Sequence, residues 1–285
     1  MLMRTMIIST CLALIGLHNA FSQITYPTPR DAEKLMNTKT LVVLEDNMFS
    51  SFNSHIKAVV NEFWDITEFE LVSAKEFNEK RRDEQYSFLV PVQTSFQKDK
   101  SNTQWVFLNL LLGAKTKAIA GMPEFCSIPL YVISEEEEEY GYYLPLIIQF
   151  IQKRVVQIKE NPDVRSLENL TYYNKNIPML ENKTIFVLEN DLSPEINTIE
   201  KIAEYYPGKI KIVASDEMGE VIKAKSGNIV VLHSVGPGTA EDVGRCYKML
   251  FGADDSKMYF FDYHTINPKR PDGLLSRDLK RLCRF

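Results

Sequence analysis

The chain has 285 residues and a formal net charge of −5 at pH 7, with 33 lysines and arginines against 38 aspartates and glutamates. This mild excess of acid argues against a chain-wide attraction to nucleic acid or to anionic membranes, so we expect no nucleic-acid partner. The length is sufficient for one large domain or two ordinary domains, each with a buried core.

The first 22 residues have the pattern of a secretory signal peptide. Arg4 precedes an apolar run from Met6 to Leu17, and Ala20-Phe21-Ser22 supplies a small-x-small cleavage site. We expect cleavage after Ser22 and a mature chain that is secreted or periplasmic. We expect no transmembrane segment after this cleavage, because the later apolar runs are too short to span a bilayer.

A heptapeptide that occurs twice organises the rest of the chain. Lys39-Thr-Leu-Val-Val-Leu-Glu45 recurs as Lys183-Thr-Ile-Phe-Val-Leu-Glu189, with five identities in seven positions. Each copy opens a longer parallel, so we predict two tandem units. The predicted boundaries are an extended N-terminal arm at 23–38, a first unit at 39–160, a linker at 161–181 and a second unit at 182–285.

Hydrophobic periodicity in the first unit alternates between strand and helix patterns. The near-continuous apolar run Thr40–Glu45 predicts a strand covered on both faces, and apolar residues spaced by three and four predict a helix over 50–63. The remaining predicted elements are strand Phe69–Ser73, helix 74–83, strands Tyr86–Gln93 and Trp105–Leu112, return strand Lys117–Ala120 and closing helix Leu144–Lys159. An insertion, Met122–Tyr140, adds a strand at Ile128–Ile133.

The second unit repeats this order. Ser193 is the predicted N-cap of its first helix, and Pro194 is the first helical residue. The predicted elements are strand Thr184–Glu189, that helix, strand Lys209–Ala214, helix Asp216–Lys225, strand Asn228–His233, a hairpin with arms in Ala240–Phe251 and Lys257–His264, and closing helix Gly273–Arg284. Each unit is therefore predicted to be β-α-β-α-β-β-β-α, an α/β (α+β) fold with helices packed on a mixed sheet.

Acidic residues follow the leading strand of each unit. Glu45 and Asp46 end the first, and Glu189 and Asp191 end the second. Ligands of open α/β sheets bind at the carboxyl ends of strands, so these carboxylates are candidates for ligand binding or acid/base work. The alternative is that acidic residues simply start the turns, and that both copies keep them as shared architecture.

His233 and a glycine-containing loop are the other candidates for a ligand site. His233 with His264 and Asp262 would permit acid/base or metal chemistry, although no metal-binding spacing occurs and a structural histidine pair is the alternative. Gly236-Pro-Gly238-Thr239 resembles the start of a phosphate-binding turn, but the fuller glycine motifs are absent and a plain connecting loop is the alternative. We expect neither a cofactor nor a metal.

Three cysteines remain after the predicted cleavage, Cys126, Cys246 and Cys283, which permit at most one disulfide and require none. The chain contains no CxxC and no G-x-S-x-G, so the sequence gives no sign of dithiol redox or serine hydrolase chemistry. Tyrosines are paired in three places, which permits either a recognition surface or ordinary core and rim packing. These pairs are Tyr142-Tyr143, Tyr172-Tyr173 and Tyr205-Tyr206.

The sequence favours a binding function. We expect a non-enzymatic protein of the cell envelope that binds an unknown protein or small-molecule partner in the cleft between its two units. Two alternatives stay open. One is a hydrolase or transferase that acts on a phosphorylated or glycan substrate through the acids at the strand ends, and the other is a scaffold component of an envelope assembly.

Overall fold

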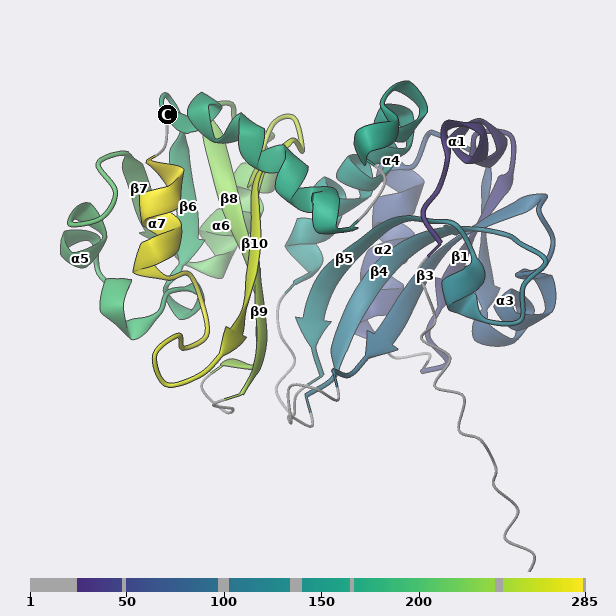
Figure 1. Ribbon diagram of the computed structural model, residues 1–285, viewed down its shortest axis with the longest axis horizontal. Coiled ribbons are helices and arrows are strands. Elements are labelled where there is room, and N and C mark those ends of the chain that lie inside the picture. Colours follow the sequence, from purple (N-terminus) through teal and green to yellow (C-terminus); the bar gives the residue numbers. More distant parts are fainter. Residues whose placement is uncertain are drawn as a thin grey trace, which may run out of the picture.

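Two five-stranded mixed sheets form the frame of the molecule (Figure 1). The structure, a computed structural model, describes residues 25–47, 50–96, 103–133, 140–164, 167–238 and 243–283. The predicted signal peptide with its cleavage site after Ser22, and Thr239 of the glycine-containing loop, lie outside the described residues.

The first sheet has the strand order β2-β1-β3-β4-β5, in which β1, β2 and β3 are parallel and β4 and β5 are antiparallel. The elements are β1 (Lys39–Leu44), α2 (Ser51–Phe63), β2 (Phe69–Ser73), α3 (Ala74–Lys80), β3 (Tyr86–Thr94), β4 (Trp105–Leu112), β5 (Glu124–Val132) and α4 (Leu144–Glu160). Ser73 caps α3 in a capping box with Glu76, which satisfies backbone N–H groups at the start of this short helix.

The second sheet has the equivalent order, β10-β9-β8-β6-β7, with the same parallel and antiparallel pairs. Its elements are β6 (Thr184–Leu188), α5 (Ile199–Ala203), β7 (Lys209–Val213), α6 (Ser215–Lys223), β8 (Ile229–Val235), β9 (Gly244–Gly252), β10 (Met258–Ile266) and α7 (Ser276–Leu282). Both units therefore have the predicted order β-α-β-α-β-β-β-α, and the prediction of two tandem α/β repeats is confirmed.

Three local predictions were wrong. The partner of β4 is β5, which contains the strand assigned to the insertion, whereas Lys117–Ala120 forms no strand and the chain passes through a short 3-10 turn at Ile119–Gly121. The arm is not extended throughout, because Thr28 and Asp31 form a capping box that starts helix α1 (Pro29–Leu35). Ser193 makes no capping hydrogen bond, and a 3-10 turn at Pro194–Ile196 precedes α5, which Thr198 caps.

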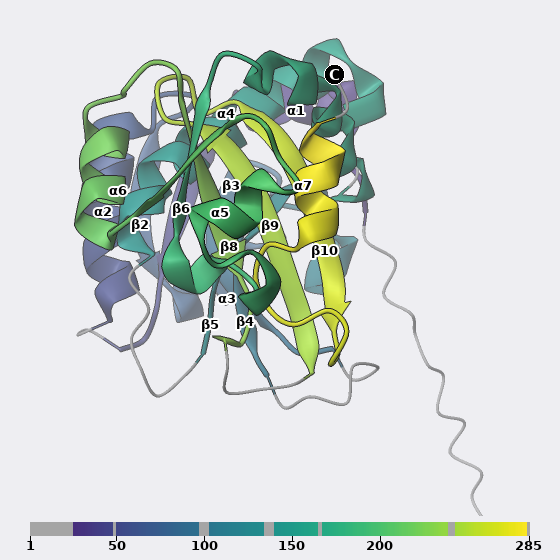
Figure 2. The same cartoon turned by 90° about the vertical axis from the view of Figure 1, so that its left-hand side faces the viewer.

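The two units share one hydrophobic core. Phe52 of α2 and Ile147 of α4 belong to the same buried cluster as Met218 of α6 and Met249 of β9. The first sheet contributes to this shared core the face that is covered by α2 and α4. The second sheet contributes the face that is covered by α6, which is not the equivalent face. Figure 2 looks onto the remaining face of the second sheet, which α5 and α7 cover.

This arrangement shows that the repeated heptapeptides are not equivalent in the fold. Val43 packs with Phe77 of α3, whereas its sequence match Val187 packs with Ile202 of α5. The helix α5 of the second unit corresponds to α2 of the first unit and not to α3, so Val43 and Val187 point to non-equivalent faces of their sheets. The structurally equivalent positions of β1 and β6 are therefore offset by one residue from the sequence match. Glu45 and Glu189 therefore do not occupy corresponding positions.

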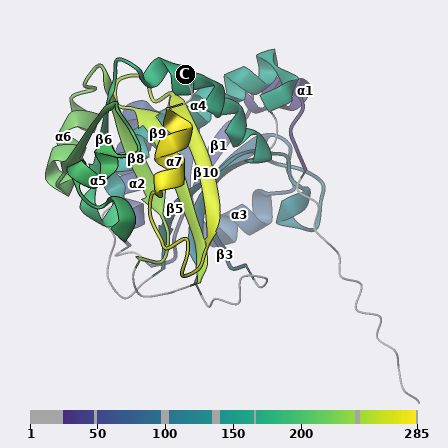
Figure 3. The same ribbon diagram turned by 60° about the vertical axis from the view of Figure 1, so that its left-hand side comes forward.

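The segment between the units is a packed structural element. It forms a 3-10 helix, η5 (Leu167–Leu180), that lies along the edge strand β10 (Figure 3). The side-chain amide of Asn174 donates to the Phe261 carbonyl at 3.0 Å and accepts from the Phe261 N–H at 2.7 Å. The linker thereby covers an edge whose backbone groups would otherwise lack partners.

Buried polar groups fix α7 to the second sheet. Lys248 of β9 donates to Asp278 of α7 at 2.5 Å and to Nδ1 of His264 at 3.0 Å, and both members of the ion pair are fully buried. His264 Nε2 donates in turn to the Pro271 carbonyl at 2.8 Å.

Among the described residues, no helix is both long enough and apolar enough to cross a membrane.

Candidate functional site

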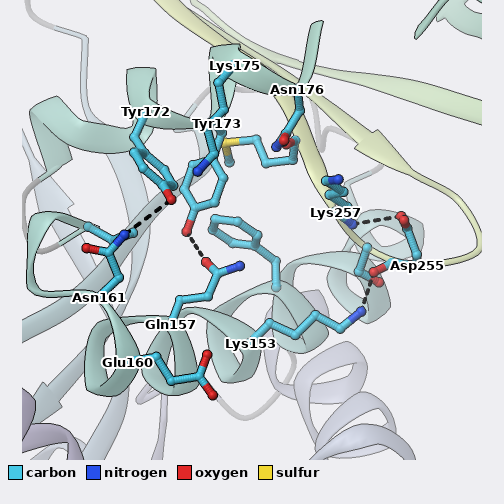
Figure 4. A pocket seen from close by; sticks show the side chains of 14 residues that line it. Lys153, Gln157, Glu160, Asn161, Tyr172, Tyr173, Lys175, Asn176, Asp255 and Lys257 are labelled. Carbon is cyan, nitrogen blue, oxygen red and sulfur yellow. Dashed lines mark hydrogen bonds between the residues drawn. The ribbon is translucent and has the colours of Figure 1, made fainter. Parts of the chain in front are cut away.

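A cavity of about 460 Å³ lies at the junction of the two units. Its walls come from the C-terminal half of α4, from η5 and from the turn between β9 and β10, so both units and the linker contribute (Figure 4). This volume lies within the range of small-molecule sites.

The floor of the cavity is apolar and buried. It consists of Phe150, Val164, Tyr173 and Met258, each no more than 3% exposed. The Phe150 ring meets the Tyr173 ring edge-on at 5.2 Å and the Phe251 ring at 5.4 Å, which joins the floor to the shared core. Such a floor favours the apolar part of a ligand.

Hydrogen bonds fix the position of Tyr173. Its hydroxyl donates to Gln157 Oε1 at 2.6 Å and accepts from Arg154 Nη1 at 3.2 Å. Arg154 is almost fully buried and also donates from Nε to the Phe125 carbonyl at 2.7 Å. Burial raises the pKa of Tyr173 to about 12, so its hydroxyl stays protonated at neutral pH and can keep donating.

Three lysines lie on the rim. Lys153 donates to the Asp255 backbone carbonyl, the Lys175 ammonium stands 3.4 Å from the centre of the Tyr172 ring, and Lys257 Nζ lies 3.0 Å from the Met179 sulfur. None of the three forms an ion pair with a carboxylate of the described residues. The rim therefore offers positive charge that the described part of the chain does not neutralise directly.

Acidic and amide groups complete the lining. Glu160 and Asp255 are the acidic residues of the described lining, and the Asp255 carboxylate accepts from the Lys257 backbone N–H at 2.9 Å and from the Tyr259 hydroxyl at 3.4 Å. Asn176 donates to the Met258 carbonyl at 2.8 Å. The Gln157 amide nitrogen and the Asn176 amide oxygen have no partner among the described residues, so each can bond a ligand.

The predicted acids of the first unit lie at a separate place. Glu45 accepts from the Tyr131 hydroxyl at 3.1 Å and from the Ser50 hydroxyl at 2.5 Å, and Tyr131 stacks on Tyr140 at 4.4 Å. Asp46, the next residue, is exposed. This end of β1 does carry polar and aromatic side chains, but Glu45 is held by its own neighbours.

Of the acid and histidine candidates in the second unit, Glu189 is exposed, whereas Asp191 and His233 make contacts within the fold. Glu189 and Asp191 form a 3-10 turn, and the Asp191 carbonyl accepts from the Leu274 N–H at 2.7 Å. His233 is 1% exposed, and its Nε2 donates to the Pro129 carbonyl of the first unit at 2.9 Å. Burial lowers the pKa of His233 to about 4, so the ring is neutral and serves as a contact between the units.

His233 and His264 do not form a pair. His233 belongs to the side of the second sheet that faces the first unit, where it contacts the Tyr143 ring at 4.6 Å, and His264 bonds Lys248 on the side of α7. The described residues contain no group of three or more histidines, cysteines or carboxylates able to hold a metal. Cys126, Cys246 and Cys283 are free thiols.

The glycine-containing loop holds a carboxylate of the chain itself. Gly238 N–H donates to Asp272 Oδ2 at 2.6 Å, and Gly238 has a φ of 69°, which favours glycine. A Cβ at Gly236 would lie 2.0 Å from Asp272 Oδ1, so the side-chain-free backbone is what lets Asp272 approach. Burial raises the pKa of Asp272. The loop thus contains an intramolecular anion contact, with Asp272 in the place that an external phosphate would take.

None of the seven predicted site residues lines the junction cavity. The expected site between the units was not assigned to particular residues by the sequence. The available signals were the tyrosine pair Tyr172-Tyr173 in the linker and the apolar closing helix Leu144–Lys159 between the units. The lysines gave no signal, because isolated lysines are typical of any exposed surface.

Comparison with protein families, with curated proteins and with solved structures finds no match to this chain.

Proposed function

We propose that this protein is a non-catalytic binding protein of the cell envelope, and that a small molecule occupies the cavity at the junction of its two repeats. The observation that carries the proposal is the composition of this cavity. A buried apolar floor lies beneath a rim on which three lysines have no carboxylate partner among the described residues. Apolar sites with a few directed polar groups are typical of small-molecule binding.

The position of the cavity gives binding a physical consequence. Its walls belong to α4, to η5 and to the β9–β10 turn, so a ligand there contacts both units at once. A ligand that binds only the folded protein stabilises it by RT ln(1 + [L]/Kd), about 2.7 kcal/mol at a concentration of 100 Kd. Ligand binding is therefore expected to raise the thermal midpoint of the whole chain.

The catalytic alternative has less support. It calls for a cavity that joins at least two of the strand-end acids to His233, and the junction cavity contains none of these residues. Glu45 is bonded by Tyr131 and Ser50, and His233 is enclosed between the units. Catalytic acids and bases need access to a substrate, which a 1% exposed imidazole lacks.

The scaffold alternative calls for a broad exposed apolar patch. The large apolar side chains that are exposed among the described residues lie on different segments of the chain. They are Tyr26, Ile119, Ile133, Val156, Met179, Ile199, Val243 and Tyr263.

The proposal of the envelope compartment rests on the signal-like N-terminus alone. Fractionation of cells expressing the full chain and a form without residues 1–22 tests it, since only the full chain is expected outside the cytoplasm.

A cavity-blocking pair of variants tests the binding site. Gln157→Trp places a large ring on the cavity side of α4, whereas Val156→Trp adds the same ring at an exposed neighbouring position of the same helix. We expect compounds from a library of sugars, nucleotides, amino acids and organic acids to raise the melting temperature of the native chain and of Val156→Trp. The same compounds should not raise that of Gln157→Trp. Equal shifts in all three proteins, or no binding compound at all, would refute the proposed site.

A further inference from the structure

We propose that the ligand of the junction cavity is a small hydroxylated ring that carries one acidic group, the chemistry of a sugar acid or a sugar phosphate. This inference rests on the proposed function, because it assigns a ligand class to the same cavity. Three features support it, namely the charge of the rim, the unused amide groups and the apolar character of the floor.

The rim supplies the charge for an acidic group. Lys175 Nζ faces the Tyr172 ring at 3.4 Å, and Lys257 Nζ has the Met179 sulfur at 3.0 Å. An aromatic face and a thioether attract a cation only weakly compared with a carboxylate. Neither ammonium group forms an ion pair with a described carboxylate. The described lining has three lysines, Lys153, Lys175 and Lys257, against two carboxylates, Glu160 and Asp255, which leaves one net positive charge.

The type of cation on the rim determines which geometry the acidic group of the ligand must have. The basic residues among the described lining are all lysines, and Arg154 lies beneath the floor, where it donates to Phe125 and Tyr173. An ammonium group acts as a compact point charge and imposes no planar two-pronged geometry. It therefore accepts a carboxylate and a phosphate alike.

The amide groups call for hydroxyls. Gln157 uses its oxygen to accept from Tyr173, which leaves its amide nitrogen as a donor. Asn176 uses its nitrogen to donate to Met258, which leaves its amide oxygen as an acceptor. A hydroxyl group both donates and accepts, so neighbouring hydroxyls on a ring can satisfy both amides. A ligand without hydroxyls would remove water from these groups without replacing its hydrogen bonds, at a cost of about 1–3 kcal/mol for each group left unpaired.

The floor accepts the apolar face of the ring. Phe150 and Met258 lie in the lining and are at most 3% exposed, so this part of the floor offers a small apolar contact and no polar side chain. A saturated sugar ring has one face dominated by C–H groups, which packs on aromatic and thioether surface while its hydroxyls reach outward. The volume of about 460 Å³ lies within the range of small-molecule sites and has room for a mono- or disaccharide.

Calorimetric titration with four probes tests this class. The probes are galacturonic acid, galactose 1-phosphate, galactose and benzoate, which separate the acid, the phosphate, the uncharged ring and the acid without hydroxyls. We expect at least one of the two charged sugars to bind, and galactose and benzoate to bind at least about tenfold more weakly, which corresponds to about 1.4 kcal/mol. The stronger of the two charged sugars identifies the acidic group.

Matched lysine variants locate the charge. Lys257→Met is expected to weaken binding of the charged sugar by about tenfold or more, an amount typical of one charge-assisted hydrogen bond. Lys223→Met removes a charge from the exposed end of α6, away from the cavity, and is expected to change nothing. Unchanged melting temperatures without ligand show that both variants fold.

The outcomes separate the ligand class from the proposed function. The ligand class is wrong if galactose or benzoate binds as tightly as the charged sugars. It is also wrong if Lys257→Met binds the charged sugars as tightly as the native chain does. The class is also wrong if only unrelated compounds bind and Gln157→Trp abolishes their binding, and in each of these cases the cavity remains a ligand site. If no compound responds to Gln157→Trp, the cavity proposal and the ligand class fail together.

Discussion

Removing one partner of the buried Lys248–Asp278 ion pair is expected to destabilise the second unit strongly. Neither side chain has any exposed surface, and Asp278 Oδ2 also accepts from the Leu275 N–H at 3.0 Å at the start of α7. Lys248→Met leaves the buried Asp278 carboxylate with only the half-exposed Arg277, whose Nε lies 3.7 Å from Oδ1, and Asp278→Leu leaves a buried ammonium. Each single change is expected to lower the free energy of unfolding by about 3–5 kcal/mol. That is a large part of the 5–15 kcal/mol typical of a folded protein.

The double variant distinguishes electrostatic pairing from simple loss of packing. Lys248→Met with Asp278→Leu removes both charges and keeps apolar volume, so we expect it to lose no more than about 2 kcal/mol, less than either single variant. Urea denaturation followed by circular dichroism, with fluorescence as a second probe for intermediates, measures all four proteins. The exposed pair Lys39–Glu70 is the control, and Lys39→Met should have no resolvable effect. Additive losses in the double variant would refute the reasoning.

Three further predictions concern other buried or half-buried groups. The pKa of His233 is about 4 when folded and 6.5 when exposed, so its contribution to stability is present above pH 6.5 and is lost as the pH falls towards 4. Compared with His233→Phe, the native chain should lose about 1.4 kcal/mol per pH unit across this window in urea titrations, and parallel curves would contradict the assignment. Burial raises the pKa of Glu124 from 4.5 to about 7, so its contribution is present below pH 4.5 and is lost as the pH rises through 7. Glu124→Gln should therefore be more stable than the native chain at pH 8, by up to about 3 kcal/mol, with the two converging at pH 4.5, and a difference independent of pH would count against this. Asn174→Ala removes both side-chain hydrogen bonds to Phe261 and should cost about 1–3 kcal/mol and speed amide exchange along β10, whereas unchanged exchange would show that η5 does not protect this edge.

The order of the elements was predictable because it depends on local patterns. Apolar runs such as Thr40–Glu45 and apolar residues spaced by three and four, as in 50–63, reflect which face of a strand or helix is buried. The hairpin arm predicted in Ala240–Phe251 is confirmed as strand β9. The partner of β4 was missed because Lys117–Ala120 follows a plausible turn, and only sheet pairing decides which later segment returns.

The repeated heptapeptide shows where a sequence match stops being informative. It predicted the duplication, and the two sheets have the same strand order. It also suggested that Glu45 and Glu189 are equivalent, which the fold contradicts, because Val43 and Val187 face different sides of their sheets. A strand changes face with every residue, so an alignment offset of one residue reverses what each side chain contacts.

The sequence by itself determined the two-unit α/β plan, since periodicity encodes burial over a few neighbouring residues. Only the tertiary structure decided that the face carrying α2 and α4 meets the face carrying α6, and that α4, η5 and the β9–β10 turn enclose one cavity. Lys153, Lys175 and Lys257 are separated by long stretches of chain and share no motif. They converge because the two units pack in one particular orientation, which is set by the sum of many long-range contacts and is carried by no single segment.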